Sequence, residues 1–187
     1  MNPPAAADCE TIVAGFLAQP VNSLSTIAFI LVAILIWRRG SRRFGWIIAG
    51  VGVGSFLFHG PWTDRGEGIH DFTLALGLLE LVRPPRFWLI AAGLAGLFAV
   101  LPVVADPISG GLAVGAIVTV LAAHKLRAAP ALTVAGVGAL VGRLSATGGP
   151  WCFPDSIFQG HAFWHLAAAV ALGMVALLEV DRWSRRP

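Results

Sequence analysis

Seven long apolar stretches follow one another along the chain, and only short linkers separate them. Each is close to the ~20 residues that an α-helix needs to cross the hydrocarbon core of a bilayer, although the third is the shortest. The linkers contain glycine and proline, as loops between helices do. We therefore predict an all-α polytopic membrane protein with seven transmembrane helices in one domain, residues 1–187. The expected helices cover approximately residues 18–37, 44–61, 69–83, 86–104, 109–125, 129–146 and 157–179.

The composition excludes an ordinary water-soluble domain. Hydrophobic residues make up 57% of the chain and charged residues 12%, and the mean hydropathy is +0.78. Because soluble domains carry about 25% charged residues, this chain has too little polar surface to cover a water-soluble globule. The net charge of +3 does not indicate a nucleic-acid partner, since the basic residues stand in small groups between apolar stretches.

The basic residues also predict the orientation of the chain. Most of the 13 lysines and arginines fall in every second linker or after the last helix, which the positive-inside rule places in the cytoplasm. The N-terminus is then outside and the C-terminus cytoplasmic. Because lysine is rare and alanine and glycine are abundant, we expect a bacterial inner-membrane protein with the outer side in the periplasm. The basic residues on the inner side are Arg38, Arg39, Arg42, Arg43, Arg83, Arg86, Lys125, Arg127, Arg182, Arg185 and Arg186.

Four of the five histidines fall at the outer ends of expected helices. His59 ends the second helix, His70 begins the third beside Asp71, and His161 and His165 begin the seventh. Charged side chains inside a membrane cost about 2.5–3.5 kcal/mol on insertion scales, so they tend to be functional. We therefore expect these residues to form one site near the outer face.

The spacing within this group is typical of a metal site. His161 and His165 are four residues apart and project from one helical face, as do Ser55 and His59. A catalytic zinc takes three protein ligands and keeps a fourth position for water, a count that His59, His161 and His165 supply. His70 is the rival third ligand, although it stands at the edge of a loop.

Other polar and small residues leave alternatives open. Asn22, Ser23 and Ser25 open the first helix, where they either cap it or brace the metal site by hydrogen bonds. Below the histidine pair, Ala168 and Gly173 allow either close helix packing or room for an acyl chain.

The two cysteines, Cys9 and Cys152, both fall on the predicted outer side. In an oxidising compartment such a pair forms either a disulfide, joining the N-terminal segment to the loop before the seventh helix, or two free thiols.

Three motifs together resemble the SxxFH…D…HAxWH signature of the alkaline ceramidase family. They are SFLFH ending at His59, Asp71 in the following helix, and HAFWH from His161 to His165. The family belongs to a superfamily of seven-helix membrane hydrolases that also includes the adiponectin/progestin-type receptors. The predicted outside N-terminus matches the ceramidase branch.

The resemblance implies a function for each residue. His59, His161 and His165 would bind zinc, and Asp71 and Ser55 would assist catalysis. Family members cleave the amide of ceramides, so the implied substrate is a lipid amide that comes from the bilayer and yields a fatty acid and an amine. Cys9 and Cys152 resemble the paired cysteines of the family.

The N-terminal segment departs from the family pattern. The family carries an acid-rich segment associated with calcium, and here Asp8 and Glu10 are the only remnants, while Gln19 stands where a glutamate is expected. The resemblance therefore gives little support for calcium. Phe72 also replaces the acid that often follows the catalytic aspartate.

Other function classes fit the sequence less well. A seven-helix receptor or sensor with a structural metal and little turnover is the alternative to an enzyme. A transporter would need polar residues that continue to the inner face, and the inner halves of the expected helices are apolar except for Glu80. A retinal-binding photoreceptor would need a lysine in the middle of a helix.

Overall fold

The computed structural model describes residues 8–61, 63–82, 84–100 and 105–184, and every regular element in them is helical. The prediction of an all-α chain is therefore confirmed for these residues. Arg83, Arg185, Arg186 and the expected helix ends at 83 and 101–104 lie outside the described residues. The elements are α1 (Pro20–Ser25), α2 (Ile27–Arg38), α3 (Arg42–His59), α4 (Asp64–Val82), α5 (Phe87–Val100), α6 (Ala105–His124), the 3₁₀ helix η2 (Lys125–Ala128), α7 (Ala129–Leu144) and α8 (Gly160–Ser184).

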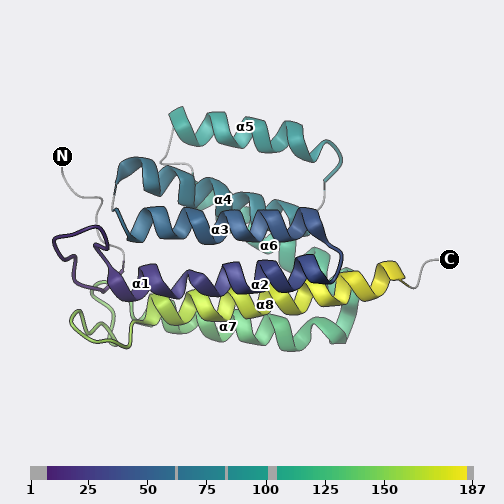
Figure 1. Cartoon of the computed structure of the whole chain (residues 1–187). Helices are drawn as coiled ribbons and strands as arrows, with labels where there is room; N and C mark the ends of the chain where they lie inside the picture. Colours follow the sequence, from purple (N-terminus) through teal and green to yellow (C-terminus); the bar gives the residue numbers. More distant parts are fainter. Residues whose placement is uncertain (1–7, 62, 83, 101–104, 185–187) are drawn as a thin grey trace.

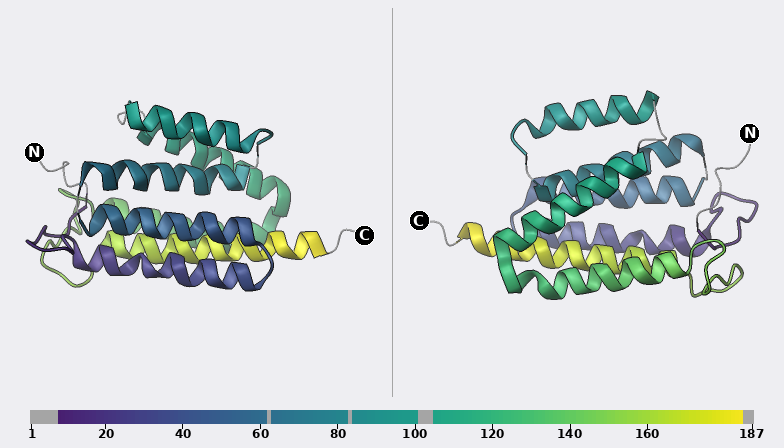
Figure 2. Two further views of the ribbon diagram at one scale, coloured as in Figure 1. Left: turned by 45° about the horizontal axis from the view of Figure 1, so that its top comes forward. Right: turned by 180° about the vertical axis from the view of Figure 1, so that it is seen from behind.

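The helices lie side by side in a bundle (Figures 1 and 2). α2 packs against both α3 and α8; α3 in turn contacts α4, and α8 contacts α7. α5 and α6 both pack on α4. The N-terminal segment and the loop before α8 meet at one end of the bundle, far from the C-terminus (Figure 1). The first and last helical segments of the chain are therefore neighbours in space.

A core of bulky and small side chains holds α2, α3 and α8 together. Phe29 of α2 and Phe44 and Ile48 of α3 are buried against Ala169 and Ala176 of α8. Alanine at these positions lets the α8 backbone approach the aromatic and branched residues of its neighbours, which gives close packing between the helices.

Two glycines mark close approaches between neighbouring helices. A Cβ atom at Gly138 of α7 would collide with Ala167 of α8, and one at Gly54 of α3 would collide with Thr73 of α4. The contact at Gly54 brings the end of α3, with His59, beside the beginning of α4, with His70.

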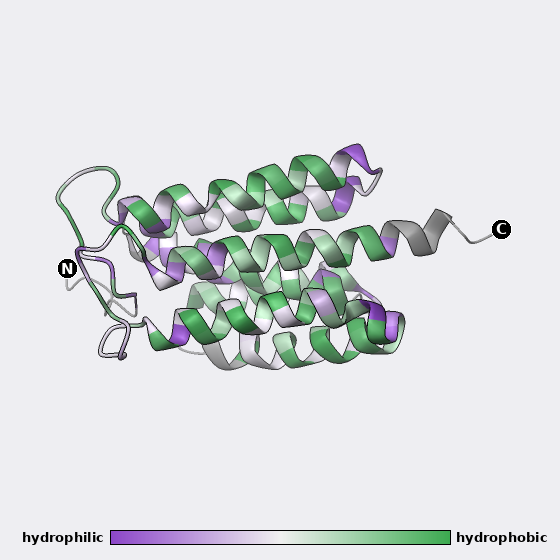
Figure 3. Ribbon diagram, turned by 90° about the horizontal axis from the view of Figure 1, so that it is seen from below, coloured by the Kyte–Doolittle hydropathy of each residue, from purple (hydrophilic) through white to green (hydrophobic). Residues whose placement is uncertain are grey.

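The outer faces of the helices are apolar. Leu31, Trp88, Leu89 and Val114 are each more than 60% exposed. Hydrophobic residues run along the helices, and hydrophilic ones gather toward their ends (Figure 3). Among the described residues, three segments are long and apolar enough to cross a membrane: Pro20–Arg38, Ile108–Leu144 and Gly160–Glu179. These features indicate a membrane protein, and the seven spans and their orientation stay predictions.

The helix boundaries differ from the expected ones where polar residues are involved. α4 begins at Asp64 rather than at residue 69, so the third helix is not a short one. The first expected helix is divided at Thr26, where the hydroxyls of Ser25 and Thr26 donate to the carbonyls of Asn22 and Ser23. Such local bonds compete with the regular pattern of a helix.

The close contact at Gly138 predicts a specific loss of stability. We expect Gly138→Ala to destabilise the fold by about 1–3 kcal/mol, because the added methyl has no space beside Ala167. Gly136 lies on the same helix with open space around its Cβ position. Gly136→Ala should therefore be neutral or gain up to ~1 kcal/mol from helix propensity. Thermal unfolding of the purified protein in detergent measures both; equal effects would contradict the packing assignment.

Candidate metal centre

Three histidines from two helices meet at the end of the bundle where the N-terminal segment lies. His59 is the last residue of α3, and His161 and His165 stand in the first two turns of α8. Their ring centroids are 4.5–5.1 Å apart, and one ligand nitrogen of each lies within 4.8 Å of the others. His59 and His165 are buried and His161 is partly buried. The prediction that these three residues come together is confirmed.

Gln19 and Ser25 fix the orientation of two of the rings. The side-chain oxygen of Gln19 is 2.7 Å from Nδ1 of His59, and the hydroxyl of Ser25 is 2.7 Å from Nδ1 of His165. The Ser25 hydroxyl donates its own proton to the carbonyl of Asn22, so it accepts the proton of His165 Nδ1. The Gln19 oxygen can only accept. Both Nδ1 atoms therefore carry the ring proton.

Asp8 takes the same position at the third ring. Its Oδ1 lies 2.7 Å from Nδ1 of His161, and its Oδ2 lies 3.6 Å from Nδ1 of His59. Beside a carboxylate, whose oxygens are acceptors, the tautomer of His161 with its proton on Nδ1 is the favoured one. All three imidazoles thus turn a lone pair on Nε2 toward the interior of the site.

The Nε2 atoms identify the kind of ligand that fits. All three are buried and have no hydrogen-bond partner in the part of the chain that the structure describes. Buried polar atoms are usually satisfied, and three converging lone pairs need a partner that accepts electron density from all of them. A metal cation meets this requirement, since neutral imidazole suits Zn, Cu, Fe and Ni. The residues present therefore fit a bound metal ion.

His70 lies next to the three histidines but is not one of the converging ligands. Its ring centroid is 6.1 Å from that of His59, and its Nδ1 is 3.0 Å from Oδ1 of Asp71. Asp71 thus meets His70, and no hydrogen bond or ion pair between described residues joins it to His59, His161 or His165. The three-histidine set is the better supported of the two ligand sets predicted from the sequence.

An apolar cavity begins beside the metal centre. It has a volume of about 210 Å³, and Ser55, His70, His161 and His165 form its polar wall. Phe29, Val51, Leu74 and Trp164 are among the residues that form the remainder. Ser55 is 2% exposed, so this hydroxyl is held inside the protein.

A second cavity of about 180 Å³ continues between α4, α6, α7 and α8. Leu78, Ala168 and Leu172 line both cavities. Ala168 borders both cavities, whereas a Cβ at Gly173 would press on Val32 of α2, as close helix packing predicts.

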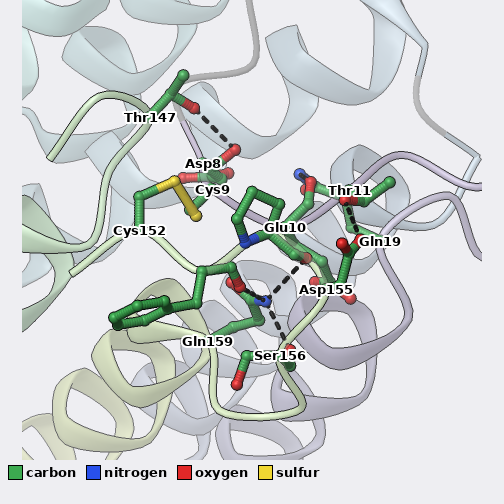
Figure 4. Close-up of a disulfide and its surroundings, with 12 residues drawn as sticks. Asp8, Cys9, Glu10, Thr11, Gln19, Thr147, Cys152, Asp155, Ser156 and Gln159 are labelled. Atoms are coloured by element: carbon green, nitrogen blue, oxygen red, sulfur yellow. Dashed lines mark hydrogen bonds between the residues drawn. A yellow bond between two sulfur atoms is a disulfide. The ribbon is translucent and has the colours of Figure 1, made fainter. Parts of the chain in front are cut away.

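A disulfide joins the N-terminal segment to the loop before α8 (Figure 4). The sulfurs of Cys9 and Cys152 are bonded at 2.06 Å, so the free-thiol alternative does not apply. In the same loop, the side-chain amide of Gln159 donates to the carbonyls of Phe153, Pro154 and Ser156. This fixed loop leads directly into His161.

Glu10, one of the two calcium remnants, has protein partners for both carboxylate oxygens. They accept from the backbone N–H groups of Val21 and Asn22 at 2.7 and 2.8 Å. A carboxylate at this position stabilises the beginning of α1, whose first N–H groups have no partner within the helix. Asp8, the other remnant, faces His161 and His59.

Only one of the residues that hold the histidine rings, Ser25, was predicted from the sequence. The predicted bracing by Ser25 is confirmed, while Ser23 instead donates to the carbonyl of Gln19, the residue before α1. Asp8 and Gln19 were missed as histidine partners, because no periodic pattern connects them to α3 or α8. Asp8 directly precedes Cys9 of the predicted outer side, which was the available signal for Asp8.

No protein-family model matches the chain, and a search of curated proteins found no match.

The geometry predicts which histidines are needed for metal. We expect the wild-type protein to bind one metal ion per chain, and the alanine variants of His59, His161 and His165 to lose it. His70→Ala should keep the metal, because its ring faces Asp71 rather than the converging nitrogens. Elemental analysis of the purified proteins measures the stoichiometry. Loss of metal from the His70 variant, with retention in one of the other three, would overturn the ligand assignment.

Proposed function

We propose that the protein is a zinc-dependent membrane hydrolase that cleaves the amide bond of a ceramide-like or other N-acyl lipid. The products are a fatty acid and an amine. One observation carries the proposal: three buried Nε2 lone pairs converge beside an apolar cavity that continues between the helices. The resemblance of SFLFH, Asp71 and HAFWH to the alkaline ceramidase signature supports the same reaction.

Zinc is the proposed ion because three neutral histidines with a further position open are a common catalytic set for it. When bound, zinc supplies Lewis acidity toward the acyl carbonyl and an activated water as nucleophile. His59, His161 and His165 would hold the ion. Gln19, Ser25 and Asp8 would keep the three rings turned toward it.

Proton transfer is assigned to Asp71 together with His70. The family resemblance gives this role to Asp71, which would take the proton of the attacking water and pass it to the leaving amine. His70 lies between Asp71 and the cavity, with its Nδ1 within hydrogen-bonding distance of the carboxylate. The pair therefore provides a path for the proton from the cavity to Asp71.

Ser55 is assigned the role of hydrogen-bond donor to the oxygen of the acyl carbonyl. It stands one turn before His59 on α3, and its hydroxyl borders the cavity. A hydroxyl in this position can donate to the oxygen that becomes negative during attack on the amide, in a buried place where such a bond is strong.

The cavities supply the place for the acyl chain. Their walls away from the histidines are leucine, alanine, valine and aromatic side chains, which bind hydrocarbon and exclude water. The amide would stand at the polar wall with its chain below, between α4 and α8. In the proposed topology of seven spans with the N-terminus outside, this substrate comes from the outer leaflet of a bacterial inner membrane.

The reaction is tested with lipids. We expect purified protein to hydrolyse at least one member of a panel of N-acyl lipids, and Asp71→Asn to slow turnover by on the order of 10²–10⁴-fold. Mass spectrometry of lipids from cells that express each form identifies the accumulated acyl species. A transition-metal chelator should abolish activity, whereas a calcium chelator should not, because Glu10 is bonded to Val21 and Asn22. Lipid binding without turnover would instead favour a receptor or sensor.

The acyl site is tested by filling it. Ala168 borders both cavities, so Ala168→Phe should lower turnover of long-chain amides about tenfold or more while short-chain amides are still cleaved. Leu166 lies two residues away on the outer face of α8 and is 48% exposed. Leu166→Phe is therefore the matched control and should leave the chain-length preference unchanged. If both variants show the same chain-length preference, the acyl chain does not bind in these cavities.

A further inference from the structure

The carboxylate of Asp8 lies close to two of the proposed metal ligands, which come from different helices. Its two carboxylate oxygens lie 2.7 Å from Nδ1 of His161 on α8 and 3.6 Å from Nδ1 of His59 on α3. The residue is only 8% exposed, so water does not weaken these interactions. One carboxylate thus bridges the two parts of the chain that form the site.

Three contacts fix the backbone at Asp8 and Cys9. The next residue, Cys9, is bonded to Cys152, and Asp8 itself pairs with Ala146 in a β-bridge. The hydroxyl of Thr147 donates to the carbonyl of Asp8 at 3.1 Å (Figure 4). The carboxylate is therefore held against the loop that leads into α8, and little conformational entropy remains to be lost when it contacts His161.

We infer that Asp8 is a positioning residue of the metal centre, which orients His161 and His59 and raises the affinity for the ion. Metal-binding histidines generally donate their second N–H to an oxygen acceptor, and a carboxylate acceptor increases the basicity of the ring. Gln19 and Ser25 offer neutral acceptors to His59 and His165. Asp8 alone among these three partners brings a negative charge, which also offsets the charge of a buried cation.

His161 has the greatest need for such a partner. Its side chain is 23% exposed whereas that of His59 is fully buried, so packing alone restricts its ring less. It also stands in the first turn of α8, directly after the loop that ends at Gln159. A carboxylate oxygen 2.7 Å from Nδ1 restrains this ring in the orientation that turns Nε2 inward.

The inference rests on the metal site of the proposed function, but not on amide hydrolysis. It is tested on the full-length protein by the affinity for Zn²⁺ and Co²⁺, measured in competition with a chromophoric chelator. We expect Asp8→Ala to weaken binding 10–100-fold, the range found for lost partners of metal ligands. Asp8→Asn keeps the shape and an acceptor oxygen, so its loss should be smaller. The visible absorption of bound Co²⁺ should change in the alanine variant.

Asp155 provides the matched control. Its carboxylate accepts from the hydroxyl of Thr11 at 2.8 Å, so it too joins the N-terminal segment to the loop before α8. Unlike Asp8, it has no contact with a histidine among the described residues. Asp155→Asn should therefore keep the wild-type affinity and Co²⁺ spectrum.

The outcomes separate positioning from simple tethering. Asp8→Ala with unchanged metal affinity, or Asp155→Asn with an equal loss, would overturn the inference; so would wild-type protein that binds neither ion. If Asp8→Ala does not fold, the isosteric asparagine variant decides, since it must still lose affinity relative to Asp155→Asn at equal thermal stability. If metal binding depends on Asp8 but no amide is cleaved, the hydrolase proposal is wrong and the inference about Asp8 still holds.

Discussion

Three imidazoles, two of them buried and one partly buried, face one another, and an oxygen acceptor lies beside the outer nitrogen of each. Gln19 and Ser25 accept the Nδ1 protons of His59 and His165, and Asp8 lies beside Nδ1 of His161, which leaves the three Nε2 lone pairs pointing inward. Without those acceptors the rings could turn or exchange tautomers, and the lone pairs would no longer meet. A cation is the partner that balances such a group, because converging lone pairs repel one another in a medium of low dielectric constant.

The packing of the helices sets where this group can form. Glycine at position 54 lets α3 and α4 approach, and small residues let α8 approach α2 and α3, so that His59 meets His161 and His165 at one depth. The same arrangement leaves the cavities between α4 and α8 beside the histidines. The same helix contacts therefore produce both the group of histidines at the end of the bundle and the apolar cavities within it.

Parts of the site could be predicted from the sequence, and the limit has a physical reason. The spacing of His161 and His165, and the place of His59 at a helix end, follow from the regular rise of an α-helix. Asp8 and Gln19 lie in a segment without periodicity, whose path depends on a disulfide and on the bond of Glu10 to the beginning of α1. The early start of α4 was hidden because residues 64–68 are polar or glycine. The cavities could not be predicted, since they depend on side chains of four helices at once.

The disulfide joins residues 143 positions apart, so about three-quarters of the 187 residues lie between the two sulfurs. Cys9 leaves the ribosome early and Cys152 late, and α8, which brings two of the three ligands, comes after both. A partly synthesised chain that lacks α8 has His59 but not His161 or His165. The three-histidine site therefore cannot form before α8 has been synthesised, and a bound ion would mark chains that contain this helix.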